Sequence, residues 1–93
     1  MKIFDGHIEV LVLIGLTMSK SRVVICGVAR TPIGSFLGTL SSITATELGV
    51  ATVKELCSRV GIDESSGIID EVLFGQVLQA GCGQNPARQV ALG

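Results

Sequence analysis

The sequence is poor in the residues on which most binding and catalytic sites depend. It has a single histidine, no tryptophan, no tyrosine and three phenylalanines. Charged residues make up 16% of the chain, the net charge is −1, and no block of like charge occurs. Scattered basic residues with so few aromatics argue against nucleic-acid binding. The lack of a polybasic segment argues against electrostatic binding to a membrane surface.

Cysteine is scarce and poorly spaced for metal or disulfide chemistry. Cys26, Cys57 and Cys82 lie far apart in the sequence, and the one histidine, His7, is near its start. A structural zinc site takes four closely spaced ligands, which this set does not supply, so we expect no metal site. Three cysteines cannot all pair within the chain, so we expect reduced thiols in a cytosolic or organellar compartment.

Length and hydrophobicity together indicate a piece of a larger fold. A chain of 93 residues forms at most one small domain, yet 47% of its residues are hydrophobic. Such a composition suits elements that are buried on both faces, as in a parallel sheet covered by helices.

Residues 1–17 differ in character from the rest of the chain. An apolar run over residues 8–16 is interrupted by Glu9 and Gly15, and it is shorter than the ~20 residues that cross a bilayer. The segment has no arginine and no clear small-residue cleavage site, so it makes a poor presequence or signal peptide. We therefore expect an upstream extension ahead of Met18. A divergent targeting segment and a structural strand are the alternatives.

Two strands and a helix are predicted between residues 23 and 77. Residues 23–28 are a continuous apolar run typical of a strand buried on both faces, and the strand must end before Pro32. Residues 70–77 carry a second apolar run. A strand, a helix and a strand of these lengths predict an α/β fold, a βαβ unit whose parallel strands are joined by a right-handed crossover helix.

The intervening helix has complete start and stop signals. Thr44 and Glu47 form a capping box, and Gly61 suits the left-handed position just past the end. We predict an amphipathic helix over residues 46–60, with an apolar stripe spaced three or four residues apart. The stripe consists of Val50, Val53, Leu56, Cys57 and Val60. A second helix is predicted to begin at Pro86, capped by Asn85.

Residues 80–86 are a loop that follows a predicted strand and leads into the second predicted helix. A dinucleotide-binding motif, Gly-x-Gly-x-x-Gly, would occupy this position. Gly81 and Gly83 match its first two glycines, but Pro86 occupies the third position, so we expect no cofactor site. The N-terminus of a helix stabilises a thiolate, and Cys82 lies just before the second predicted helix. No nearby histidine could serve as a base for this thiol.

The other singled-out residues favour structural roles. We interpret Cys82 as a small loop thiol, and Cys26 and Cys57 as buried small hydrophobic residues. Arg30 ends a strand, where α/β proteins bind ligands, yet pairing with a carboxylate or a backbone carbonyl is favoured. For Arg88 an ion pair within the domain or at a subunit interface is expected.

Two stretches carry a family resemblance. Residues 28–36 read Val-Ala-Arg-Thr-Pro-Ile-Gly-Ser-Phe, and residues 74–88 read Phe-Gly-Gln-Val-Leu-Gln-Ala-Gly-Cys-Gly-Gln-Asn-Pro-Ala-Arg. In this order and separation they resemble the start of a thiolase of the acetoacetyl-CoA thiolase (acetyl-CoA acetyltransferase) kind. The resemblance covers residues 23–93 and implies a partial N-terminal domain, the first strand, helix, strand and partial helix of that fold.

The resemblance implies acyl transfer without supplying the residues that perform it. Thiolases form an acyl-cysteine, with a second cysteine and a histidine as acid and base. Their nucleophile lies in an Asn-Lys-Val-Cys-Gly-Ser-Gly-like segment, and the sequence stops at Gly93 before any such segment. We therefore assign no catalytic, cofactor-binding or metal residue. By resemblance the chain is part of an acyltransferase, but it lacks the catalytic residues, and we expect no thiolase activity from this chain alone.

Two functions are expected on this basis. The first is a thiolase fragment, inactive alone, whose family substrate is an acyl-CoA thioester and which uses no cofactor. The alternative is a short non-catalytic binding or assembly module that pairs with a full-length thiolase. Expected partners are a second copy or a thiolase, not nucleic acid or membrane. The expected compartment is the cytoplasm, with mitochondria as the alternative.

Overall fold

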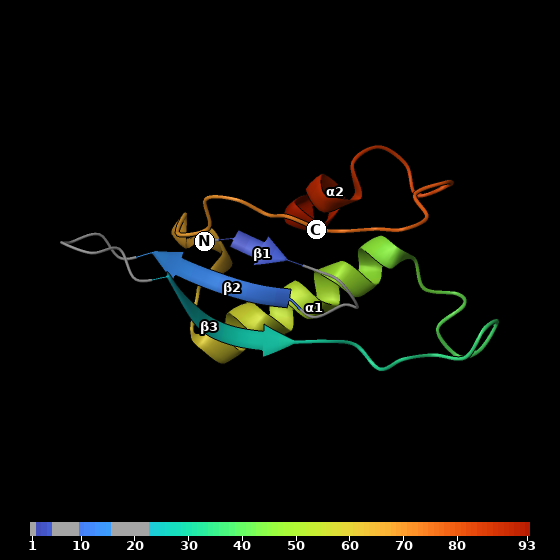
Figure 1. The fold of residues 1–93 in the computed structure, drawn as a ribbon, viewed down its shortest axis with the longest axis horizontal. Helices are drawn as coiled ribbons and strands as arrows, with labels where there is room; N and C mark the ends of the chain where they lie inside the picture. Colours follow the sequence, from blue (N-terminus) through green and yellow to red (C-terminus); the bar gives the residue numbers. More distant parts are fainter. Residues whose placement is uncertain (1, 5–9, 16–22) are drawn as a thin grey trace.

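The computed structural model describes residues 2–4, 10–15 and 23–93, and it combines a small sheet with two helices (Figure 1). The strands are β1 (Lys2–Phe4), β2 (Val10–Gly15) and β3 (Val23–Ala29). The helices are α1 (Ala45–Val60), a single 3₁₀ turn η1 (Glu64–Ser66) and α2 (Pro86–Leu92). Helix α1 lies against the sheet, and α2 packs on α1.

The sheet is antiparallel and has the strand order β1-β2-β3. In the register of β2 on β3, Val10 pairs with Ala29 and Gly15 with Val23, and a shift occurs between Val12 and Leu13. Residues 10–15 therefore form a strand, which was one alternative for the upstream segment. His7 lies outside the described residues.

The parallel strand expected over residues 70–77 is not present, which corrects that prediction. These residues form no strand in the structure, and the strand that pairs with β3 is the antiparallel β2. Ile69, Val72 and Phe74 instead pack as coil against the core around Leu56. These side chains are thus only partly buried, Val77 is 98% exposed, and a parallel βαβ unit is not formed here.

Helix α1 begins and ends as its sequence signals predict. The Thr44 hydroxyl accepts a hydrogen bond from the Glu47 backbone N–H at 3.2 Å, and the Glu47 carboxylate accepts one from the Thr44 N–H at 2.7 Å. At the other end Gly61 has φ of 70°, which a side chain would disfavour. The Ile62 N–H donates to the Cys57 carbonyl at 2.9 Å, which closes the last turn.

The core lies between α1, β3 and α2. Its most buried side chains are Leu56 (0% exposed) and Cys57 (1% exposed), both on the predicted apolar stripe, which is thereby confirmed. Strand β3 and helix α1 approach so closely that a Cβ on Gly27 would lie 2.6 Å from Val60 Cγ1. On α2, Val90 is buried at 6% exposure, and it faces Gly49 of α1.

Strand β3 is buried only where it meets α1. Ala29 is buried and Gly27 half-buried, but the other five residues of the strand are exposed. Cys26 is among the exposed residues, so the prediction that it is a buried small hydrophobic residue is wrong. The physical reason is that β3 was expected to be covered on both faces, whereas α1 covers only part of it here.

Candidate functional site

The glycine-rich loop before α2 is the most organised polar region of the described residues. Gly81 and Gly83 both have φ of 78°, so the chain makes two left-handed steps within three residues. Asn85 caps α2, as predicted, because its side-chain oxygen accepts a hydrogen bond from the Arg88 N–H at 3.1 Å. Pro86 takes the first helical position, where its missing N–H costs nothing.

A single side chain from α2 fixes this loop to α1. The Gln89 Nε2 donates to the carbonyls of Cys82 at 2.9 Å and Gln84 at 3.0 Å. Its Oε1 accepts a hydrogen bond from the Thr46 hydroxyl of α1 at 3.4 Å. Sequence reasoning missed Gln89, because the contact with Thr46 joins residues 43 positions apart and no local pattern signals it.

Cys82 is the one thiol in this loop, and its surroundings are not those of a nucleophile. The Gln76 Nε2 donates to its Sγ at 3.0 Å, and Sγ lies 3.9 Å from the carbonyls of Leu78 and Ala80. None of these groups can take up the thiol proton, whereas an activated cysteine needs an adjacent base. Among the described residues, Cys82 therefore lacks the partner that cysteine catalysis requires.

The remaining residues named from the sequence make no hydrogen bond to the Cys82 thiol among the described residues. Cys57 is buried on α1, as predicted. Arg30 and Arg88 are exposed, and no hydrogen bond within the described part of the chain joins either of them to Cys82. Close to Arg30, the Thr31 hydroxyl is buried and has no hydrogen-bond partner among the described residues.

A cavity of about 270 Å³ lies between the two helices and residues 67–72. Its wall is mainly apolar and includes Val50, Val53, Cys57, Ile69 and Val90, with Lys54 at its margin. The Lys54 ammonium donates to the Gly93 carbonyl at 2.7 Å, which joins α1 to the end of α2. The cavity thus offers apolar volume and one cation, but no acid–base pair.

Two surface carboxylates are stabilised in their charged form. The backbone N–H and then the hydroxyl of Thr44 lower the pKa of Glu47 below its ordinary value. The backbone N–H and then the hydroxyl of Ser65 lower the pKa of Asp63 in the same way. Both groups cap helical turns, so these shifts report local structure rather than a catalytic environment.

Over the described ranges, no three His, Cys, Asp or Glu side chains come together as metal ligands would. In the same ranges, no helix has the length and apolar character needed to cross a membrane.

Comparison with known proteins points to one family. Residues 23–93 match the thiolase N-terminal domain. A cytosolic acetyl-CoA acetyltransferase of Gibberella zeae is 58% identical over 71 residues, which are 76% of this chain and 17% of that protein. Acetyl-CoA acetyltransferase 1 of Arabidopsis thaliana is 54% identical over 77 residues, or 83% of this chain and 18% of the relative.

A mitochondrial acetyl-CoA acetyltransferase B of Xenopus laevis is 53% identical over 73 residues, which are 78% of this chain and 17% of that protein. The chain therefore spans less than a fifth of the length of these three relatives. No solved structure matches the chain. Because the domain match covers most of its residues, the chain belongs to the thiolase family.

Proposed function

We propose that residues 23–93 supply the amino-terminal scaffold of an acyl-CoA acetyltransferase, and that residues 1–17 are an extension outside this unit. The observation that carries the proposal is the domain match over residues 23–93, with relatives named acetyl-CoA acetyltransferase at 53–58% identity. The substrate class is then an acyl-CoA thioester, and no cofactor takes part.

The 93-residue polypeptide is proposed to be inactive alone, because its chemistry is incomplete. Acyl transfer through a cysteine needs a thiolate, a base that generates it, and donors that stabilise the oxyanion. Around Cys82 the described residues offer an amide and two carbonyls, none of which is a base. The role of this chain is therefore to build and position, while other residues of a complete thiolase carry out the transfer.

In a complete domain we propose that residues 70–77 pair in parallel beside β3, joined to it by α1 as crossover helix. The support is the apolar, strand-forming sequence of residues 70–77. Ile69, Val72 and Phe74 also pack against the core that β3 borders. Hydrogen exchange in a complete domain tests this pairing. Protected amides over residues 72–77 are expected, and rapid exchange there would contradict it.

A chimera tests the scaffold proposal directly. In the Arabidopsis acetyl-CoA acetyltransferase 1, the segment that aligns with residues 23–93 is replaced by the segment from this chain. The chimera is expected to fold and to cleave acetoacetyl-CoA with free coenzyme A. A matched chimera that carries Leu56→Ala is the control, because Leu56 is fully buried and its truncation should reduce the yield of folded enzyme. A folded chimera without turnover would contradict the proposal.

A second candidate function is a non-catalytic module that pairs with a full-length thiolase. The exposed apolar residues of β3, such as Val23 at 71% exposure, favour it. Co-purification of the tagged chain with a full-length acetyl-CoA acetyltransferase would support this function. Recovery of the chain alone would count against it.

For the compartment we propose the cytosol, as in the name of the Gibberella relative. Imaging of a carboxy-terminal fluorescent fusion tests this. A mitochondrial signal, matching the name of the Xenopus relative, is the contrary outcome.

A further inference from the structure

Two loops that carry large exposed apolar side chains project from the same end of the molecule. One loop joins β3 to α1, and the other is the glycine-rich loop before α2 with the residues that lead into it. Figure 1 shows both of them at the end where α1 begins. Their apolar residues are Ile33, Phe36, Leu37, Val77 and Leu78, each at least 79% exposed. We refer to these five residues as the apolar end.

The apolar end is surrounded by uncharged sequence. Residues 31–44 and residues 72–85 contain no Asp, Glu, Lys or Arg. Exposed apolar residues that lie together, rather than singly, mark a surface that binds another surface. The partner of this end must therefore offer apolar contacts and has no charge to neutralise.

The loop between β3 and α1 is held in shape by its own backbone. The Gly38 N–H donates to the Ser35 carbonyl at 2.9 Å, and the Ser41 N–H donates to the Gly38 carbonyl at 3.0 Å. Within the first of these turns Leu37 has φ of 54°, in the left-handed region that leucine rarely adopts. Strain of this kind persists only where the surrounding structure imposes it. The turn thus presents Phe36 and Leu37 to solvent in a fixed conformation.

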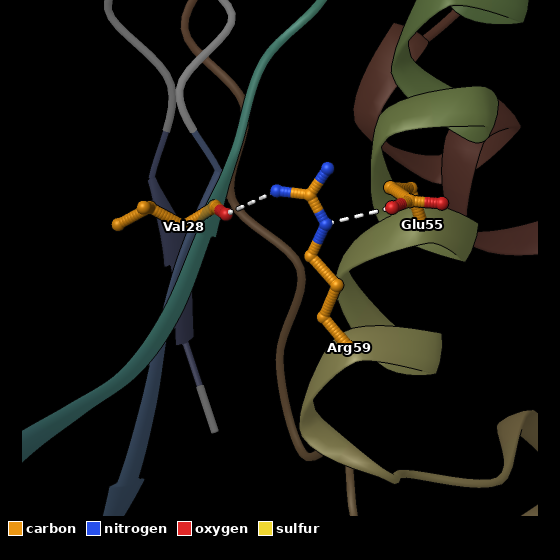
Figure 2. A network of polar contacts seen from close by, with 3 residues as sticks. All are labelled: Val28, Glu55 and Arg59. Atoms are coloured by element: carbon orange, nitrogen blue, oxygen red, sulfur yellow. Dashed lines mark hydrogen bonds and ion pairs between the residues drawn. The ribbon is translucent and has the colours of Figure 1, made fainter.

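This loop also leaves β3 from an anchored point. The Arg59 Nη1 donates to the Val28 carbonyl at 3.4 Å, while its Nε donates to the Glu55 carboxylate at 2.7 Å. Figure 2 shows the Val28 carbonyl directed at the Arg59 guanidinium, which spans the space between β3 and α1. Ala29, the last residue of the strand, is buried. The loop therefore starts at a rigid base, and the capping box of α1 fixes its other end.

The second loop is ordered by glutamine side chains. The Gln76 Nε2 donates to the Leu78 carbonyl at 3.0 Å. Farther along the loop, the Gln89 side chain binds the carbonyls of Cys82 and Gln84. Both halves of the apolar end are thus built before any partner binds, and a pre-formed surface loses less conformational entropy on binding than a flexible one.

We propose that the apolar end docks into an uncharged apolar recess on the part of a complete thiolase that lies outside the segment matched by this chain. The inference rests on the proposed scaffold role and names the surface through which the scaffold holds the rest of the enzyme. The relatives support this occupant. The matched segment makes up 17–18% of their length, so more than four fifths of each relative is present to cover the apolar end.

The parallel pairing proposed for residues 70–77 is compatible with this docking. The carboxyl ends of parallel strands meet at one edge of a sheet, so the loops that follow β3 and residue 77 would project together there as well. The docking uses these loops and leaves the free edge of β3 to residues 70–77.

A second copy of the chain suits the apolar end less well. A two-fold contact presents the same patch on both subunits, so it would set one pair of projecting loops against another. A head-to-tail contact would leave an apolar end uncovered on every open assembly. A recess on a different part of the enzyme has neither difficulty.

Thiol labelling at position 36 tests the docking directly. The change Phe36→Cys is made in the isolated chain and in the Arabidopsis chimera, and maleimide labelling of the new thiol is followed by mass spectrometry of its peptide. Labelling should be fast in the isolated chain, because Phe36 is 94% exposed. In the folded chimera it should be roughly tenfold slower or more, because a covered thiol reacts only when the contact opens. Both proteins unfolded in urea are the control and should label at one rate. Equal rates in the folded chimera and the isolated chain would overturn the proposal.

Leu37→Asn separates docking from folding. Asparagine tolerates the left-handed region better than leucine, so this change should not lower the urea midpoint of the isolated chain. In the chimera the same change removes an apolar side chain from the proposed contact and should lower the urea midpoint. Thr39→Ala, at an exposed polar position of the same loop, is the matched control and should leave both midpoints unaltered. An unaltered midpoint of the chimera with Leu37→Asn would overturn the docking of this residue.

The same labelling identifies other occupants. Labelling of the isolated chain that slows as its concentration is raised would assign the apolar end to a second copy. Labelling that slows when phosphatidylcholine vesicles are added would assign it to a lipid surface. Either result would overturn the proposal.

Failure of this inference can be distinguished from failure of the scaffold role. A chimera that folds without turning over acetoacetyl-CoA would reject the scaffold role, and its labelling rate would still decide the docking. A chimera that turns over acetoacetyl-CoA but labels as fast as the isolated chain would reject the docking alone. A chimera that does not fold would overturn both.

Discussion

The Gln89 Nε2 lies 2.9 Å from the Cys82 carbonyl, so a side chain of α2 fixes the shape of the loop that precedes its own helix. The same side chain reaches Thr46 in the first turn of α1. The loop, α1 and α2 are thus tied at one residue. One polar side chain therefore links three segments of the fold.

Gln89→Leu should loosen this loop. The change removes two donated hydrogen bonds and one accepted bond, and we expect it to cost about 1 to 2 kcal/mol of unfolding free energy, because the bonds are only partly buried. Maleimide labelling of Cys82, in a chain with Cys26→Ala, should become faster. Arg88→Gln on the same helix is the control. A labelling rate equal to that of the parent chain would show that Gln89 does not order the loop.

Thr44→Ala should weaken α1 at its start. Loss of a threonine N-cap typically costs ~1 kcal/mol, and here the Thr44 hydroxyl accepts from the Glu47 N–H. Urea unfolding followed by circular dichroism measures the change. Ser58→Ala, which removes a hydroxyl from an exposed position in the last turn of the same helix, is a useful comparison. Equal midpoints for Thr44→Ala and wild type would contradict the capping account.

Acid should weaken the same cap. The folded-state pKa of Glu47 lies below its ordinary value of 4.5, so its contribution to stability is complete above that value. The contribution is lost as the pH falls from there through the lowered folded-state pKa. As the pH is lowered from neutral, the urea midpoint of unfolding should fall less steeply in Glu47→Gln than in wild type. The same pH dependence in both proteins would show that the Glu47 carboxylate makes no net contribution to stability.

Gly27→Ala should separate β3 from α1. The added Cβ would lie 2.6 Å from Val60 Cγ1 and 3.0 Å from Leu56 Cδ1, so one element must shift. Overpacking of this kind costs roughly 1 to 3 kcal/mol. Because the nearer contact is with Val60, Gly27→Ala should cost less in a Val60→Ala background, and a double-mutant cycle measures that coupling. If the losses of unfolding free energy from Gly27→Ala and Val60→Ala simply add, the close contact between position 27 and Val60 is contradicted.

The sequence predicts the elements whose signals are local. Helix α1 could be predicted because its cap, stripe and terminal glycine lie within eighteen consecutive residues, Thr44 to Gly61. The start of α2 at Pro86 and the strand beginning at Val23 were predictable for the same reason. In each case the physical cause, a cap or a run of β-branched residues, acts between near neighbours.

What could not be predicted depends on pairing between distant segments. Residues 70–77 have the composition of a strand, but a strand also needs a partner, and these residues pair with none of the described strands. Cys26 has an apolar neighbourhood in sequence, yet it is exposed because α1 covers only part of β3. The role of Gln89 depends on a loop and a helix meeting in space, which the sequence does not display.

The most direct test of the account is a thiolysis assay of the isolated 93-residue chain with acetoacetyl-CoA and free coenzyme A. The account predicts no acetyl-CoA above the buffer rate, because the described residues provide no base for the Cys82 thiol. The same chain with Cys82→Ala is the matched control and should give the same rate. Turnover by the parent chain that Cys82→Ala abolishes would contradict the account and make Cys82 a nucleophile.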